Sequence, residues 1–122
     1  MPRKAPWRGY SGGFAPAKRV VVDEISFASK AEAQRYTFLK AKERAGEIRA
    51  LELQPRYKLT VNGEKVGTYV GDFRYIVDGK GIFVEDVKRV VTPVYELKKR
   101  LMKAIYLIDV YEIRKAAAPI GS

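Results

Sequence analysis

Asp72, Asp86 and Lys88 are the side chains whose types and spacing best suit chemistry. Asp86 and Lys88 stand two residues apart in the run 82–88, where strand alternation places them on one face and Glu85 on the other. Apolar residues on both faces indicate a central strand, in which buried charges need a partner, a metal or water. A turn joins this run to the segment that holds Asp72, so the two aspartates can come close together.

Two carboxylates and a lysine in this arrangement suit the hydrolysis of a phosphodiester bond. The carboxylates would hold one or two Mg²⁺ ions, the metal would lower the pKa of a bound water, and the lysine would orient that water or bind the phosphate. The chain has no histidine and no cysteine, which excludes Ser-His-Asp hydrolysis and imidazole or thiolate metal sites. We therefore expect oxygen ligands and Mg²⁺, with Mn²⁺ able to substitute. The ordinary alternative is a structural network of ion pairs.

Glu32 has two interpretations. Ser29 suits the N-cap of a helix that runs to about Ala45 before Gly46, and Glu32 stands at the capping-box position of that helix. Glu32 also shares one helical face with Tyr36 and would then be a third carboxylate beside the metal. The residues alone leave both interpretations open.

The remaining elements predict an α/β fold of the mixed α+β type, with a mixed central sheet flanked by helices. Thr92 and Pro93 suit a helix start, and the strand-helix-strand run at the end predicts two parallel strands if they are neighbours. Asn62-Gly63 and Asp78-Gly79 are hairpin turn signals. Strand-like segments occupy residues 20–22, 48–53, 56–61, 65–77, 81–88 and 106–113.

The charge of the chain indicates a polyanionic partner. Lys and Arg number 24 against 14 Asp and Glu, a net charge of +10, which favours nucleic acid over acidic lipid or a merely soluble basic protein. Residues 1–19 are expected to form a flexible basic arm that lies on phosphates, the alternative being an untied terminus. Residues 20–115 would form a single domain and 116–122 a disordered tail. The cations of the arm are Arg3, Lys4, Arg8, Lys18 and Arg19.

The apolar runs are too short to span a membrane, and the basic N-terminus is not followed by the apolar stretch of a secretory signal. We therefore expect no membrane partner and a cytoplasmic location.

Several spaced segments resemble a family of small phage-encoded nucleases of the PD-(D/E)xK superfamily, which includes Holliday junction resolvases and restriction endonucleases. The resemblance covers residues 20–113. Thr92 and the start of the second helix also fit. Gly71 replaces the proline that names the motif, Ala28 an acidic residue, and Arg89 a glycine. The matching segments are FASKAE at 27–32, GEI at 46–48, LELQP at 51–55, GDFRY at 71–75 and VEDVK at 84–88.

The resemblance implies a restriction-endonuclease-like αβββαβ core with a Mg²⁺ site. Asp72 and Asp86 match the two acidic positions, Lys88 the lysine, and Glu32 the helical glutamate of the resolvase branch, which favours its interpretation as a ligand. The backbone carbonyl of Val87 completes the expected metal ligands.

The expected function is a DNA structure-selective endonuclease, a Holliday junction resolvase acting in recombination and repair in the cytoplasm of a phage-infected host. Two symmetric cuts in a four-way junction require two sites and so predict a homodimer. The alternatives are a phage nuclease for other branched, single-stranded or duplex DNA, and a non-catalytic basic DNA-binding protein.

Four further residues are candidate DNA contacts, each with an ordinary alternative. Gln54 would otherwise satisfy the backbone near Pro55, and Tyr69 would be ordinary strand packing. Lys98 and Lys99 would otherwise form a solvated helix face.

Overall fold

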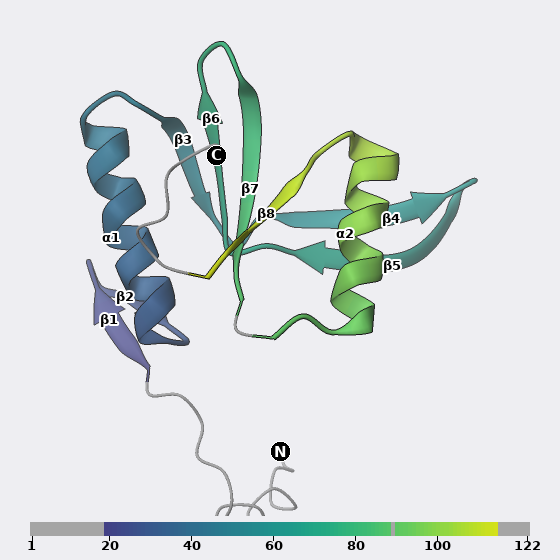
Figure 1. Cartoon of the computed structure of the whole chain (residues 1–122), viewed down its shortest axis with the longest axis horizontal. Helices are drawn as coiled ribbons and strands as arrows, with labels where there is room; N and C mark the ends of the chain where they lie inside the picture. Colours follow the sequence, from purple (N-terminus) through teal and green to yellow (C-terminus); the bar gives the residue numbers. More distant parts are fainter. Residues whose placement is uncertain (1–18, 89, 115–122) are drawn as a thin grey trace, which may run out of the picture.

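The computed structural model describes residues 19–88 and 90–114 (Figure 1). Arg3, Lys4, Arg8, Lys18 and the tail 116–122 lie outside the described residues. The elements are β1 (Val20–Val22), β2 (Ile25–Phe27), α1 (Lys30–Arg44), β3 (Arg49–Leu53), β4 (Arg56–Val61), β5 (Glu64–Val70), β6 (Phe73–Val77), β7 (Gly81–Val87), α2 (Pro93–Tyr106) and β8 (Val110–Ile113).

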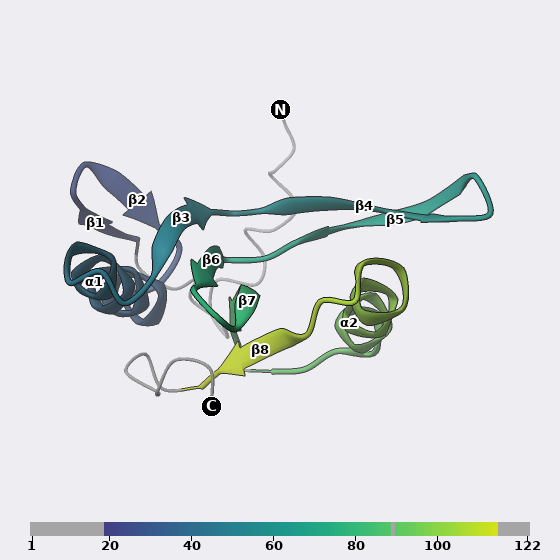
Figure 2. The same cartoon turned by 90° about the horizontal axis from the view of Figure 1, so that it is seen from above.

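The central sheet has four strands in the order β3-β6-β7-β8. β6 is antiparallel to β3 and β7, whereas β7 and β8 are parallel, with α2 as their crossover connection. Figure 2 shows α1 on one side of the sheet and α2 on the other. Apart from the hairpins β1–β2 and β4–β5, the element order is αβββαβ. The predicted mixed fold, with a mixed sheet flanked by helices, is confirmed.

Alternation along β7 divides the core as the sequence predicted. Phe83 packs in a cluster with Tyr36 and Leu39 of α1. Val84 packs on the opposite face in a cluster with Tyr95 of α2. β7 therefore lies between two apolar layers. The buried carboxylates of Glu85 and Asp86, which follow Val84, need hydrogen-bond or ion-pair partners there.

Both predicted helix starts are confirmed by capping bonds. The Ser29 hydroxyl accepts a hydrogen bond from the Glu32 N–H at 3.2 Å. The Thr92 hydroxyl accepts one from the Tyr95 N–H at 3.1 Å, with proline in the first turn of α2. The first helix ends as expected, with Gly46 at a φ of +79°.

The predicted single strand over residues 65–77 is wrong. β5 ends at Val70 and β6 begins at Phe73, because the chain leaves a separate two-stranded sheet and enters the central one between them. Pro55 lies opposite this break and has no N–H for a ladder, while the preceding Gln54 has a φ of +52°. We call β4, β5 and their turn (residues 56–70) the ribbon.

The predicted last strand over residues 106–113 is too long. α2 continues to Tyr106, and Leu107 in the left-handed conformation ends it by donating its N–H to the Lys103 carbonyl. Strand β8 begins only at Val110. The sequence also gave no signal for β2, which pairs with the predicted strand β1. No helix within the described residues is long and apolar enough to cross a membrane.

Candidate active site

The two aspartates meet where β6 begins and β7 ends. Phe73 pairs with Glu85 in the ladder, so Asp72 lies beside the end of β7. The Asp72 N–H donates to the Glu85 carbonyl at 2.9 Å. The Val87 N–H donates to Asp72 Oδ2 at 2.7 Å. Backbone bonds on both sides therefore fix the Asp72 carboxylate next to Asp86.

Asp86 is nearly fully buried and has a different partner at each oxygen. The Tyr69 hydroxyl donates to Oδ2 at 2.6 Å, and Lys88 Nζ lies 3.3 Å from Oδ1. Lys88 also lies over the ring of Tyr95, 4.1 Å from its centroid. The structure thus brings together Asp72, Asp86 and Lys88, the three residues on which the sequence argument began.

Burial and nearby negative charge raise the pKa values of Asp72 and Glu32. Burial is the largest cause of the rise in the pKa of Asp72 to about 7. The Val87 N–H opposes this rise, whereas the charges of Asp86 and Glu32 and a hydrogen bond with Asp86 add to it. The pKa of Glu32 is also raised, chiefly by burial and further by the charge of Asp86. The charge of Asp86 thus opposes the ionisation of Asp72 and Glu32, and a divalent cation would relieve this repulsion.

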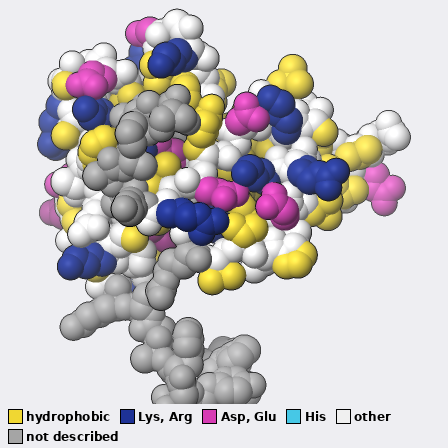
Figure 3. Space-filling model, viewed as in Figure 1, with side chains coloured by type: hydrophobic (Ala, Val, Ile, Leu, Met, Phe, Trp, Pro, Cys, Tyr) yellow, Lys and Arg dark blue, Asp and Glu magenta, His cyan; other side chains and the backbone are white. Residues whose placement is uncertain are grey.

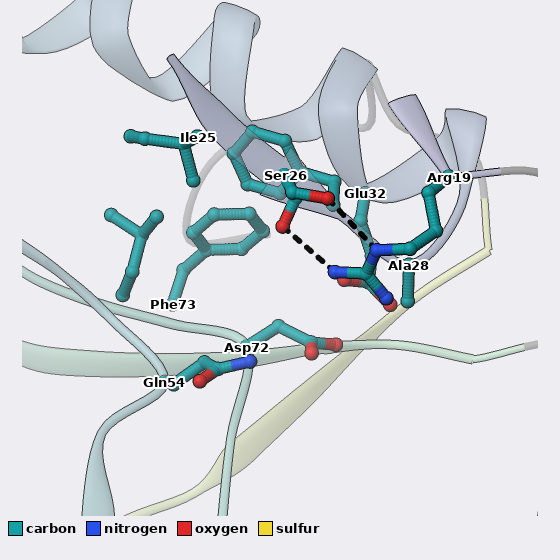
Figure 4. Close-up of a pocket in the computed structure, with 10 residues that line it drawn as sticks. Arg19, Ile25, Ser26, Ala28, Glu32, Gln54, Asp72 and Phe73 are labelled. Carbon is teal, nitrogen blue, oxygen red and sulfur yellow. Dashed lines mark hydrogen bonds between the residues drawn. The ribbon is translucent and has the colours of Figure 1, made fainter. Parts of the chain in front are cut away.

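Glu32 reaches this centre from α1. A cavity of about 300 Å³ separates α1 and β2 from β3 and β6, and it is lined by Arg19, Glu32, Gln54 and Asp72. Figure 4 shows Glu32 and Arg19 on one wall and Asp72 and Gln54 on the other. A hydrogen bond with the Ala28 backbone lowers the pKa of Glu32. The capping bond of α1 uses the Glu32 N–H, which leaves the carboxylate at the cavity.

The donor set is suited to a hard cation, because every acidic group in it offers carboxylate oxygens. As the side chains stand in residues 19–88 and 90–114, however, no three acidic residues are grouped closely enough to hold a metal ion. Asp72 and Asp86 are in contact, while Glu32 lies across the cavity. The residues fit Mg²⁺ by chemistry, and Glu32 would have to move toward the pair to complete its coordination. The Val87 carbonyl stays a predicted ligand.

The predicted DNA contacts lie around the two aspartates. Gln54 lines the cavity, and its backbone N–H donates to the Asp72 carbonyl at 2.9 Å. Tyr69 packs in the core as well as binding Asp86, and burial followed by that bond raises the pKa of its hydroxyl. The Tyr69 hydroxyl therefore stays protonated as the donor at neutral pH. Arg19 is held by Ser26, with its Nε 2.8 Å from the Ser26 hydroxyl.

Lys98 and Lys99 have different surroundings on α2. Lys98 lines a second cavity, of about 270 Å³, together with Asp86, Lys88 and Tyr95. Lys99 forms an ion pair with Glu112 at 2.8 Å, so its charge is already balanced. Figure 3 shows positive and negative side chains interspersed over α2 and β8, so this face is not uniformly basic.

The structure explains why position 71 is glycine, which sequence reasoning did not predict. A Cβ at this position would lie 3.0 Å from Val84 Cγ1 and 3.3 Å from the ring of Tyr69. The tyrosine that binds Asp86 thus occupies the space that a side chain at position 71 would need. Glycine here, in place of the expected proline, allows Tyr69 to reach Asp86.

A buried ion pair supports the site from the opposite face of β7. Glu85 accepts hydrogen bonds from Arg35 of α1, at 2.7 Å from Nε and 2.6 Å from Nη2, and from the Tyr75 hydroxyl. Glu85 therefore faces away from Asp86, as alternation predicted. Sequence reasoning missed the contacts of Arg35 with Glu85 and of Tyr95 with Lys88. No local sequence pattern indicates which distant residue an arginine or a tyrosine on a helix will contact.

Comparison with known proteins assigns the chain to a family. No curated protein and no solved structure gives a match. The family model described as "Protein of unknown function (DUF1064)" matches residues 15–116, which include every described residue. The chain belongs to the DUF1064 family.

Proposed function

We propose that this protein is a Mg²⁺-dependent endodeoxyribonuclease of the PD-(D/E)xK type. One observation carries the proposal: Asp72 and Asp86 are in contact at the end of a buried strand, with Lys88 3.3 Å from Asp86. A purely structural ion-pair network would balance its charges. Here burial and the charge of Asp86 raise the pKa values of Asp72 and Glu32, and only one lysine pairs with these carboxyl groups among the described residues.

In the proposed hydrolysis of a phosphodiester bond, the acidic residues would bind the metal and Lys88 would donate hydrogen bonds. Asp72 and Asp86, with Glu32 and the Val87 carbonyl, would hold the metal, and Tyr69 keeps Asp86 Oδ2 in place. Bound Mg²⁺, or Mn²⁺ in its place, would polarise the phosphate and lower the pKa of a coordinated water. Lys88, which lies 3.3 Å from Asp86 Oδ1, would donate hydrogen bonds to a water or to a phosphate oxygen as charge develops.

The proposed substrate is a four-way DNA junction, cut by a homodimer during recombination or repair in a phage-infected cell. The net charge of +10 supports a DNA partner. A basic surface contacts phosphates without reading base edges, so recognition of DNA shape and backbone is favoured. Two active sites are needed for two symmetric cuts, and one chain contributes one.

The test is cleavage of a four-way junction, a flap, a nicked duplex and a linear duplex, with Mg²⁺ or with EDTA. We expect Mg²⁺-dependent cleavage that is fastest on the junction. Asp86→Asn and Lys88→Ala should each lower cleavage at least 100-fold while leaving DNA binding intact. Asp109→Asn and Lys80→Ala, which change exposed residues away from the site, are matched controls. Calorimetric titration with Mg²⁺ gives a second readout, and Asp86→Asn should weaken binding there.

Each outcome of the panel has a definite meaning. Unchanged cleavage in both site variants would refute the site. Equal rates on all four substrates would refute junction selectivity but keep the endonuclease. Binding of DNA without cleavage of any substrate would favour a non-catalytic DNA-binding protein. A monomer with and without junction DNA would contradict the resolvase.

A further inference from the structure

The ribbon (residues 56–70) is a two-stranded sheet of its own, separate from the central sheet. Figure 2 shows it extending past α2, well beyond the rest of the fold. It starts next to the proposed active site, because Asp72 follows the last residue of β5 after only Gly71. The Gly71 N–H donates to the Pro55 carbonyl at 3.0 Å and closes the base of the ribbon.

The pairing register assigns each ribbon side chain to one of two faces. Leu59 and Tyr69 are buried in the cluster that includes α2, and Tyr57 packs against that cluster. The cross-strand partners Arg56–Val70, Lys58–Thr68 and Thr60–Lys65 alternate with these residues. They therefore point to the opposite, outer face.

The outer face is basic and contains no carboxylate. Arg56, Lys58 and Lys65 are exposed, and none of them forms an ion pair within the described part of the chain. Glu64, at the tip, is paired with Val61, which is on the same face as Tyr57 and Leu59. Glu64 is therefore not on the outer face. By contrast, Lys99, Lys103 and Arg114 on the α2 and β8 side each have an acidic partner.

The ribbon is anchored on its inner side, which leaves the outer face open. The Tyr106 hydroxyl of α2 donates to the Lys58 carbonyl at 2.5 Å. Arg74 Nε of β6 donates to the Tyr57 hydroxyl at 2.9 Å. A basic surface that is held in place and has no acidic partner in residues 19–88 and 90–114 presents fixed charges to a ligand.

We propose that the outer face of the ribbon docks in a groove of double-stranded DNA next to the bond that is cut. The proposal rests on the proposed function for the identity of the polyanion. A two-stranded ribbon fits the major groove of B-DNA, and β4 spans about 20 Å, or roughly six base-pair steps. Arg56, Lys58 and Lys65 contact the phosphates that border the groove, and the hydroxyls of Thr60 and Thr68 contact the DNA between them.

The first test measures binding of duplex DNA by an Asp86→Asn protein, which separates binding from cleavage. The ribbon variant carries Arg56→Ala, Lys58→Ala and Lys65→Ala. The matched control carries Arg44→Ala, Lys80→Ala and Arg100→Ala, three exposed cations outside the ribbon. In the Asp86→Asn background both sets remove three positive charges, so the two variants have the same net charge. Circular dichroism and urea denaturation confirm that both variants fold.

Removing three phosphate contacts should lower the slope of log affinity against log salt by about 2.7. Between 50 and 200 mM salt the ribbon variant should then lose roughly 40-fold less affinity than the parent protein. The control should keep the parent slope. Equal slopes for ribbon variant and parent, or an equal drop in the control, would overturn the proposal. So would a ribbon variant that loses binding to single strands but not to duplexes.

The second test maps the position of the ribbon and uses the absence of cysteine from the chain. Thr60→Cys, on the outer face, carries an iron–EDTA group that cuts nearby DNA by hydroxyl radicals, and Thr37→Cys on α1 is the control. We expect radical cleavage within about six base pairs of the enzymatic cut, from position 60 only. Radical cleavage from neither position would overturn the docking. If the protein binds through the ribbon but never hydrolyses DNA, the proposed function fails and the docking surface stands.

Discussion

Replacing Asp72 by asparagine should stabilise the metal-free protein while removing the proposed nuclease activity. In the folded protein the pKa of Asp72 is about 7, against an ordinary value of 3.8. Asparagine has the same shape but no charge. Its side-chain oxygen can accept the Val87 N–H, and its amide can donate to Asp86, so the replacement keeps the hydrogen bonds and removes the repulsion.

The magnitude follows from the proton linkage. Between pH 3.8 and 7 the unfolded chain has lost the Asp72 proton and the folded protein still holds it. The free energy of unfolding of the parent therefore falls by about 1.4 kcal/mol per pH unit across this window, and it changes no further above pH 7. The full window gives about 4 kcal/mol. Partial solvent access screens the charge, so we expect Asp72→Asn to be ~2–4 kcal/mol more stable at pH 8.

The assay is urea denaturation in EDTA at pH 4 and pH 8 for the parent, Asp72→Asn and Asp109→Asn. Asp109 lies in an exposed ion pair with Lys103, so its variant should differ from the parent by less than about 0.5 kcal/mol. At pH 4 the advantage of Asp72→Asn should nearly vanish. Millimolar Mg²⁺ at pH 8 should stabilise the parent and not Asp72→Asn. A variant that is less stable at pH 8, or an advantage that is equal at both pH values, would refute the repulsion between the carboxylates.

Two further substitutions test the groups behind the aspartates. Tyr69→Phe keeps the buried ring but removes the hydrogen bond to Asp86. Single-turnover cleavage should fall about 10- to 100-fold, while circular dichroism shows an intact fold. An unchanged rate would show that Asp86 does not need this hydrogen bond. Arg35→Ala leaves Glu85 buried without its cation and should lower the free energy of unfolding, measured by urea denaturation, by about 3–5 kcal/mol. The double change Arg35→Met with Glu85→Leu should restore most of this loss. A loss of less than about 1 kcal/mol for Arg35→Ala would contradict a buried ion pair.

The sequence predicted best what depends on neighbouring residues. Ser29 and Thr92 mark their helices because the capping bond joins residues three positions apart. The two faces of β7 followed from alternation alone, which is why Glu85 could be separated from Asp86 in advance. The approach of Asp72 to Asp86 followed from a short hairpin between two adjacent strands.

The sequence predicted less where tertiary contacts decide. The run 65–77 is β-prone throughout, and only its path from one sheet to another divides it at Gly71. The partner of Arg35 lies 50 residues away in the chain, and no local pattern indicates it. Tyr69 looked like strand packing and is packed, but its hydroxyl also binds a carboxylate 17 residues further on. Contacts of this kind need the coordinates of both partners.

The base of the ribbon makes it an exchangeable part of the molecule. The chain leaves the central sheet after Leu53 and re-enters it at Phe73, and these two residues are cross-strand partners. An insertion whose two ends are joined to paired residues of neighbouring strands can change in length or sequence, and the order of the strands in the sheet stays the same. For the proposed nuclease, exchanging only residues 60–66 at the tip, which leaves Tyr69 and Asp72 in place, is therefore a route to new DNA preferences.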